Sequence, residues 1–81
     1  MQIPVIKKLV ETRSVEELEE AENCLLEEKE LPFEIEGNDD GEVLTHIMAA
    51  TWIIEKIEKD TVPFPKALRA YTEKVRTSIS G

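Results

Sequence analysis

The chain has 81 residues, a formal net charge of −8, one cysteine and one histidine. This composition excludes an internal disulfide and the usual Cys/His zinc arrangements. A domain of this size buries only about 60–65% of the surface that its unfolded chain exposes. We therefore expect one small domain over residues 1–81 that gains stability from a partner chain.

The charges are segregated along the chain. Residues 1–13 carry a net charge of +2, residues 14–42 carry −12, and residues 43–81 carry +2. An acidic belt of this strength repels phosphates and anionic lipids, so we expect neither nucleic acid nor membrane as a partner.

No run of the sequence approaches the roughly 20 apolar residues that crossing a bilayer requires. Lys7 and Lys8 interrupt the first apolar run, which argues against a signal peptide. These observations predict a cytoplasmic protein.

The first expected helix follows Pro4, where "VIKKLVE" places apolar residues at helical spacing. Proline suits the first turn of a helix because its missing N–H has no partner there in any case. A strand over residues 2–6 is the alternative.

Residues 14–30, "SVEELEEAENCLLEEKE", give the clearest helix. Ser14 and Glu17 form a capping box, in which each side chain accepts a hydrogen bond from the backbone of the other residue. We expect Pro32 to end this helix.

A short extended segment is expected at about residues 31–36, where Leu31, Phe33 and Ile35 alternate with polar residues. The stretch "GNDDG" at 37–41 then predicts a turn, with Asp39 or Asp40 capping the next helix.

The same stretch is also compared with a calcium loop. Glu36, Asn38 and Asp40 occupy the first, third and fifth positions of that pattern. The twelfth position, however, is Ile47 instead of a bidentate glutamate, and no helix directly precedes the loop. The pattern therefore favours a turn with a helix cap.

The central helix is expected at about residues 42–59. Residues 43–54, "VLTHIMAATWII", carry no formal charge at neutral pH, which is typical of a helix buried around most of its circumference. Three other short helices can hardly cover it on all sides, so we predict that part of it lies at an interface. The predicted interface residues are Leu44, Ile47, Met48, Thr51, Trp52 and Ile54.

Pro63 and Pro65 separate the central helix from a basic fourth helix. Its apolar repeat consists of Leu68, Tyr71 (or Thr72), Val75 and Ile79, and we expect a frayed tail at about 78–81. The expected fold is a small, mostly α bundle of three to four helices, with the extended segment preceding a buried central helix.

The chain contains no recognisable catalytic motif, and we predict neither an enzyme nor a bound cofactor. The candidate metal ligands are His46 with Asp39, Asp40 and Glu42, although a histidine on a packed helix is more often hydrogen-bonded in place. Cys24 lies among glutamates, which disfavour its thiolate, so we expect a packed cysteine and not a nucleophile.

The two ends, "MQIPVIKKL" and "FPKALRAYTEKVRTSI", resemble a family of short bacterial proteins of unknown function. These proteins begin Met-x-(Leu/Ile)-Pro-Val-Ile-Lys and end in a basic Ala-Leu helix that closes in Ser-Ile. The resemblance implies a bacterial, cytosolic and mainly helical protein. Because the family has no established activity, the resemblance implies none for this chain.

The leading functional hypothesis is a non-enzymatic, self-associating protein, most simply a homodimer. The charge-free helix at 43–54 motivates this hypothesis, and we expect the opposite charges of residues 14–42 and 66–76 to fix the register of such a pair. The first alternative is an accessory subunit that docks on another protein through its apolar central helix, and the second is a small metal-binding protein.

Overall fold

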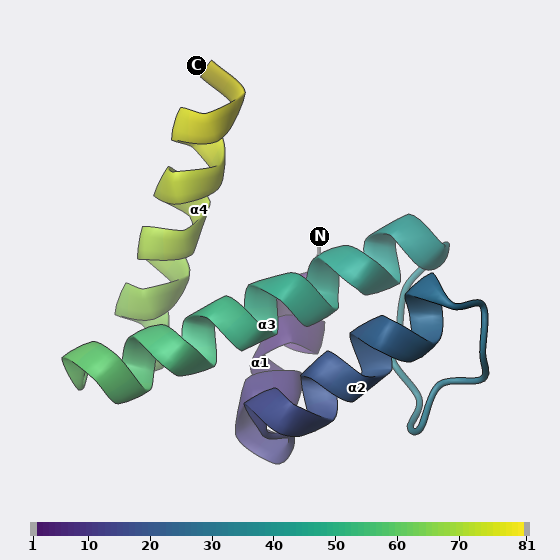
Figure 1. The fold of residues 1–81 in the computed structure, drawn as a ribbon. Coiled ribbons are helices and arrows are strands. Elements are labelled where there is room, and N and C mark those ends of the chain that lie inside the picture. The colour runs from purple at the N-terminus through teal and green to yellow at the C-terminus, as the bar shows by residue number, and fades with distance from the viewer. Residues whose placement is uncertain (1, 81) are drawn as a thin grey trace.

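The computed structural model describes residues 2–80, with side chains described for residues 2–76. Four helices make up the fold (Figure 1): α1 (Ile3–Thr12), α2 (Val15–Leu26), α3 (Asp40–Asp60) and α4 (Phe64–Ser80). No strand occurs within residues 2–80, so the mostly α prediction is confirmed. The helix expected after Pro4 is also confirmed, and the alternative strand over residues 2–6 is wrong, because α1 covers Ile3–Thr12 with Pro4 in its first turn.

The turn between α1 and α2 follows the predicted capping chemistry. The Glu17 N–H donates to Ser14 Oγ at 3.2 Å, and the Ser14 N–H donates to Glu17 Oε1 at 3.0 Å. The capping box therefore satisfies two N–H groups that the start of a helix would otherwise leave without partners.

The end of α2 comes earlier than predicted, at Leu26 and not near Pro32. The Lys29 N–H donates to the Cys24 carbonyl at 2.7 Å, and the Glu28 N–H donates to the Leu25 carbonyl at 3.2 Å. This pair of bonds is a Schellman motif, and it holds Glu28 in the left-handed region with φ of 59°. A glycine usually occupies this position and marks the end of a helix. Because Glu28 occupies it here, the sequence does not indicate that α2 ends at Leu26.

The connection between α2 and α3, residues 27–39, forms no strand, and it bends at residues 32 and 33 inside the segment 31–36 that was predicted to be extended. Ile35 is buried, and Leu31 and Phe33 are partly buried against the core, whereas the residues between them are exposed. The Arg13 guanidinium lies 4.0 Å from the centre of the Phe33 ring, which ties the connection to the end of α1. The alternation therefore fixes which side of the segment faces the core.

Helix α3 begins as the turn prediction requires. Asp39 is its N-cap and accepts from the Glu42 N–H at 2.8 Å, while Glu42 Oε1 accepts from the Asn38 N–H at 2.8 Å. The helix ends at Asp60, where Thr61 adopts a left-handed conformation with φ of 53°. Seven of its residues are buried: Val43, His46, Ile47, Ala49, Ala50, Ile53 and Ile54.

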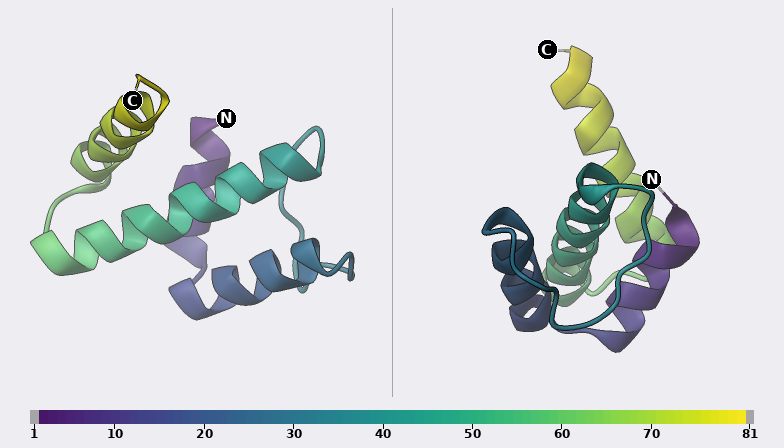
Figure 2. Two further views of the ribbon diagram at one scale, coloured as in Figure 1. Left: turned by 45° about the horizontal axis from the view of Figure 1, so that its top comes forward. Right: turned by 90° about the vertical axis from the view of Figure 1, so that its right-hand side faces the viewer.

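The other three helices all pack on α3. Figure 2 shows α1 and α2 on two sides of α3, with α4 rising away from it. We call α1, α2, α3 and the connection the body, and α4 the arm. Ala67 is the one buried residue among the described side chains of the arm.

Candidate functional site

One side of α3 remains open to solvent. We call Leu44, Met48, Thr51 and Trp52 the open stripe. Met48 lies four positions from both Leu44 and Trp52 and three from Thr51, so the four share one face of the helix. Met48 is 51% exposed, and the other three are partly buried. All four are predicted interface residues, so the structure brings this part of the predicted set together on one surface.

The other two predicted interface residues lie inside the chain. Ile47 is fully buried and Ile54 is 8% exposed, and both belong to the core cluster. The Thr51 hydroxyl donates to the Ile47 carbonyl at 2.9 Å, so its polar group is already satisfied within the helix. An interface on α3 therefore depends on the open stripe alone.

The arm continues this apolar surface. The rings of Trp52 and Tyr71 lie with centroids 5.6 Å apart at 53° to one another. Val75 lies one helical turn beyond Tyr71 on the same face and is 37% exposed. The apolar repeat in the sequence includes Val75, but the repeat does not indicate that α4 diverges from the body.

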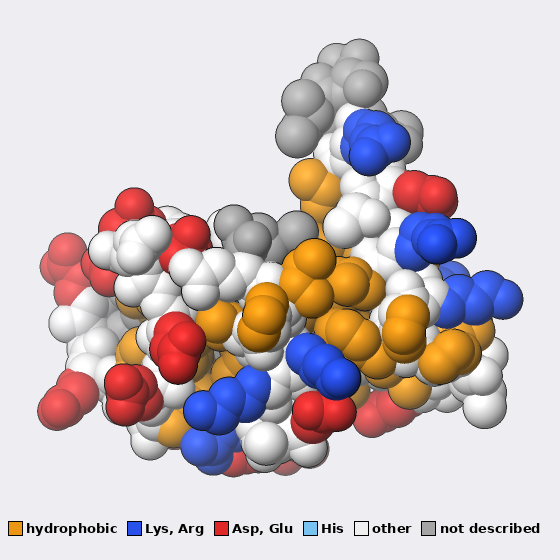
Figure 3. All heavy atoms as spheres, turned by 180° about the vertical axis from the view of Figure 1, so that it is seen from behind, with side chains coloured by type: hydrophobic (Ala, Val, Ile, Leu, Met, Phe, Trp, Pro, Cys, Tyr) orange, Lys and Arg blue, Asp and Glu red, His pale blue; other side chains and the backbone are white. Residues whose placement is uncertain are grey.

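Charged side chains surround the hydrophobic ones on this face of the molecule. Figure 3 shows acidic side chains at the end farthest from the arm, mostly Lys and Arg along the arm, hydrophobic side chains between them, and both charges mixed below. Lys66, Arg69 and Lys74 make no ion pair with the described residues. The opposite charges predicted to attract one another therefore remain largely apart within one chain.

His46, the candidate metal ligand, is fully buried and both of its ring nitrogens are in use. Nδ1 lies 2.9 Å from the Glu36 carbonyl, and Nε2 accepts from the Gln2 N–H at 2.9 Å. A carbonyl only accepts, so this arrangement requires a neutral ring with its proton on Nδ1. His46 thereby joins the start of α1 to the connection, which sequence reasoning did not identify.

The candidate acidic ligands do not converge on His46. Asp39 and Glu42 take part in capping α3, and Asp40 is exposed in the first turn of that helix. Within the described part of the chain, no group of three His, Cys, Asp or Glu side chains is placed to hold a metal ion. Cys24 is a free, partly buried cysteine on α2.

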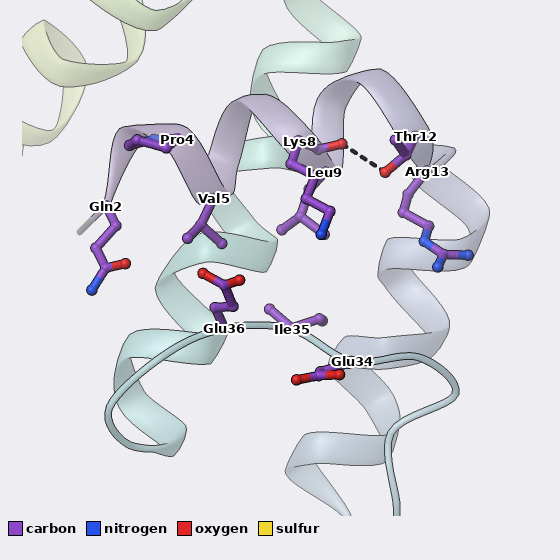
Figure 4. A pocket seen from close by; sticks show the side chains of 10 residues that line it. All are labelled: Gln2, Pro4, Val5, Lys8, Leu9, Thr12, Arg13, Glu34, Ile35 and Glu36. Carbon is purple, nitrogen blue, oxygen red and sulfur yellow. Dashed lines mark hydrogen bonds between the residues drawn. The ribbon is translucent and has the colours of Figure 1, made fainter.

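A groove of about 380 Å³ lies between α1 and residues 34–36. Figure 4 shows Ile35 of the connection opposite Val5 and Leu9 of α1, with Glu34 and Glu36 beside it. Arg13, at one end of the groove, is already paired with Glu17 at 3.2 Å. The groove therefore joins two parts of the body, and its charged groups do not converge on one point.

Two carboxyl groups and one phenol titrate away from their ordinary ranges. The Ser14 N–H, and then Arg13, lower the pKa of Glu17, while Lys56 lowers the pKa of Asp60 through a hydrogen-bonded ion pair. Burial raises the pKa of Tyr71. The carboxyl shifts belong to exposed helix termini, whereas the Tyr71 shift lies at the junction of body and arm.

The fold and the surface together define a small four-helix protein with an apolar stripe left open on its central helix. No helix within residues 2–80 combines the length and apolar character needed to span a bilayer. Residues 1–80 match the model of a family described as "Family of unknown function (DUF6952)", and the chain belongs to that family. Comparison with curated proteins and with solved structures gives no match.

Proposed function

We propose that this protein is a non-enzymatic, self-associating protein, most simply a homodimer. The observation that carries the proposal is the open stripe, in which Met48 is 51% exposed in the middle of a helix whose other sides are covered. Large apolar side chains that share an exposed surface are typical of a site of protein–protein contact.

The size of the chain supports the same conclusion. A lone core in a domain of this length supplies roughly 3–5 kcal/mol of stability, and such domains often gain the rest from a partner. Covering the stripe with a second copy removes further apolar surface from water, at roughly 25 cal/mol per Å².

Two of the side chains predicted as candidate metal ligands have structural roles in the fold. His46 joins α1 to the connection, and Asp39 caps α3. These roles support a protein that acts through its surface and not through a catalytic or metal centre.

Sedimentation equilibrium at low and high salt tests the proposal. We expect a dimer that weakens as salt rises, because the opposite charges of the acidic end and the arm are screened. A folded monomer at micromolar concentration at both salt concentrations would contradict self-association and favour docking on a different protein.

A matched pair of substitutions locates the surface. Met48→Lys places a charge in the open stripe, and we expect the dissociation constant to rise at least about tenfold, which is 1.4 kcal/mol. Leu26→Lys changes another exposed side chain, 63% exposed at the end of α2, and we expect association to be unchanged. Equal effects of the two substitutions would remove the open stripe from the interface.

A further inference from the structure

Two partly exposed apolar pieces of this molecule lie on α3 and on α4, and we infer below that they pack against each other between two copies. They extend in different directions from one contact, which we call the junction. The junction is the contact between Trp52 and Tyr71. On α3, Met48 and Leu44 lie one and two turns away from Trp52. On α4, Val75 lies one turn beyond Tyr71, towards the C-terminal end of the helix.

The arm does not cover the open stripe of its own chain. Figures 1 and 2 show that α4 rises at an angle from beside the C-terminal end of α3, so that its outer part stands off the half of α3 that begins at Asp40. Met48 accordingly keeps 51% of its surface exposed and Val75 keeps 37%. Neither piece is therefore fully covered within its own chain.

The dimensions of the two pieces agree. Eight residues separate Leu44 from Trp52, which is about 12 Å along a helix. Nine residues separate Tyr71 from the end of α4 at Ser80, which is about 13.5 Å. The outer part of one α4 is thus long enough to lie along the open half of another α3.

The charges agree as well. Lys74 lies on this outer part of the arm, and Lys66 and Arg69 lie at its base; all three are without ion-pair partners among the described residues. The start of α3, which adjoins the open stripe, carries Asp39 and Asp40 on its exposed surface. A second copy is therefore the occupant that supplies both the apolar face and the complementary charge.

On the basis of the proposed self-association, we infer that the dimer is reciprocal: the α4 arm of each copy covers Leu44 and Met48 of the other. A twofold arrangement satisfies this requirement, since each copy offers the same stripe and the same arm. Both contacts form together, and no unpaired stripe or arm remains to recruit a third copy.

Disulfide cross-linking between single-cysteine variants tests the arrangement. In a Cys24→Ser background, one chain carries Met48→Cys and another carries Val75→Cys, so no disulfide can form within a chain. We expect the mixture to give cross-linked heterodimer under mild oxidation, in excess over either variant alone. Both positions are exposed, so the core is left intact, and sedimentation checks that each variant still associates.

The matched control pairs Leu26→Cys with Val75→Cys in the same background, and we expect no cross-link. A dimer that gives Met48-to-Met48 cross-links, or none through Val75, overturns the reciprocal arrangement and leaves self-association intact. A protein that remains a folded monomer by sedimentation overturns both proposals.

Discussion

The body and the arm are held to α3 in different ways. Helices α1 and α2 contribute large buried side chains to the core, among them Ile6, Leu9 and Leu18, whereas the described part of α4 contributes only Ala67. Because hydrophobic stabilisation grows with buried apolar area, the body is a closed core and the arm is a helix only partly packed on it. Most of the buried core therefore belongs to the body, and the described part of the arm adds little to it.

Truncation of a core residue of the body should have the largest effect. We expect Ile47→Ala to lower the free energy of unfolding by about 2–5 kcal/mol, because a fully buried side chain loses its contacts and leaves a cavity. Val75→Ala on the arm should change it by less than about 0.5 kcal/mol. Urea unfolding of dilute protein measures both, and equal losses would remove the distinction between body and arm.

Removing the hydrogen bonds of His46 is the next test. His46→Phe keeps an aromatic ring but leaves the Gln2 N–H and the Glu36 carbonyl without their partner, and we expect a loss of about 1–3 kcal/mol. Faster amide exchange at Gln2 should accompany the loss. Unchanged stability together with unchanged exchange would show that His46 does not hold α1 to the connection.

The close approach of the connection to α3 can be tested at a glycine. A Cβ at Gly37 would lie 2.7 Å from Val43 Cγ2 and 3.1 Å from the Val43 N atom, so Gly37→Ala should cost about 1–3 kcal/mol. Gly41→Ala is the matched control. Its Cβ meets only Asp39 Oδ1, at 3.3 Å, and its helical position favours alanine, so we expect a change within about 0.5 kcal/mol.

The smallest effect is expected from alkaline titration at the junction. Burial raises the pKa of Tyr71, so its contribution to stability is complete below about pH 10 and is lost as pH rises through the higher value of the folded state. Tyr71 is the single tyrosine, so tyrosinate absorbance reports on it alone. Urea unfolding across the same pH range should show that the free energy of unfolding falls in the unmodified protein and does not fall in Tyr71→Phe. An equal fall in that variant would show that another group causes it.

Local chemistry made much of this fold predictable. The capping residues Ser14 and Asp39, the proline in the first turn of α1 and the alternation around Phe33 each have a short-range physical cause that a sequence displays. The early end of α2 was missed because Glu28 occupies a left-handed position without glycine.

The candidate surface was only partly predictable. An uncharged helix shows that most of its sides are covered, but the packing of the other helices decides which side stays open. Ile47 and Met48 are neighbours in the sequence, yet one is fully buried and the other is half exposed. The roles of His46 and Arg13 were likewise hidden, because their partners Gln2 and Phe33 come from separate elements.

The central position of α3 has a consequence for the order in which the chain takes shape. The substantial contacts between helices all include α3, and α1 and α2 precede it in the sequence. During synthesis these two amphipathic helices emerge before the helix on which they pack, so the core cannot close until residues 40–60 have left the ribosome. During that interval, the first two helices of the nascent chain must remain apart from other apolar surfaces. The dense negative charge of α2 helps, because it repels other acidic chains until α3 is available for packing.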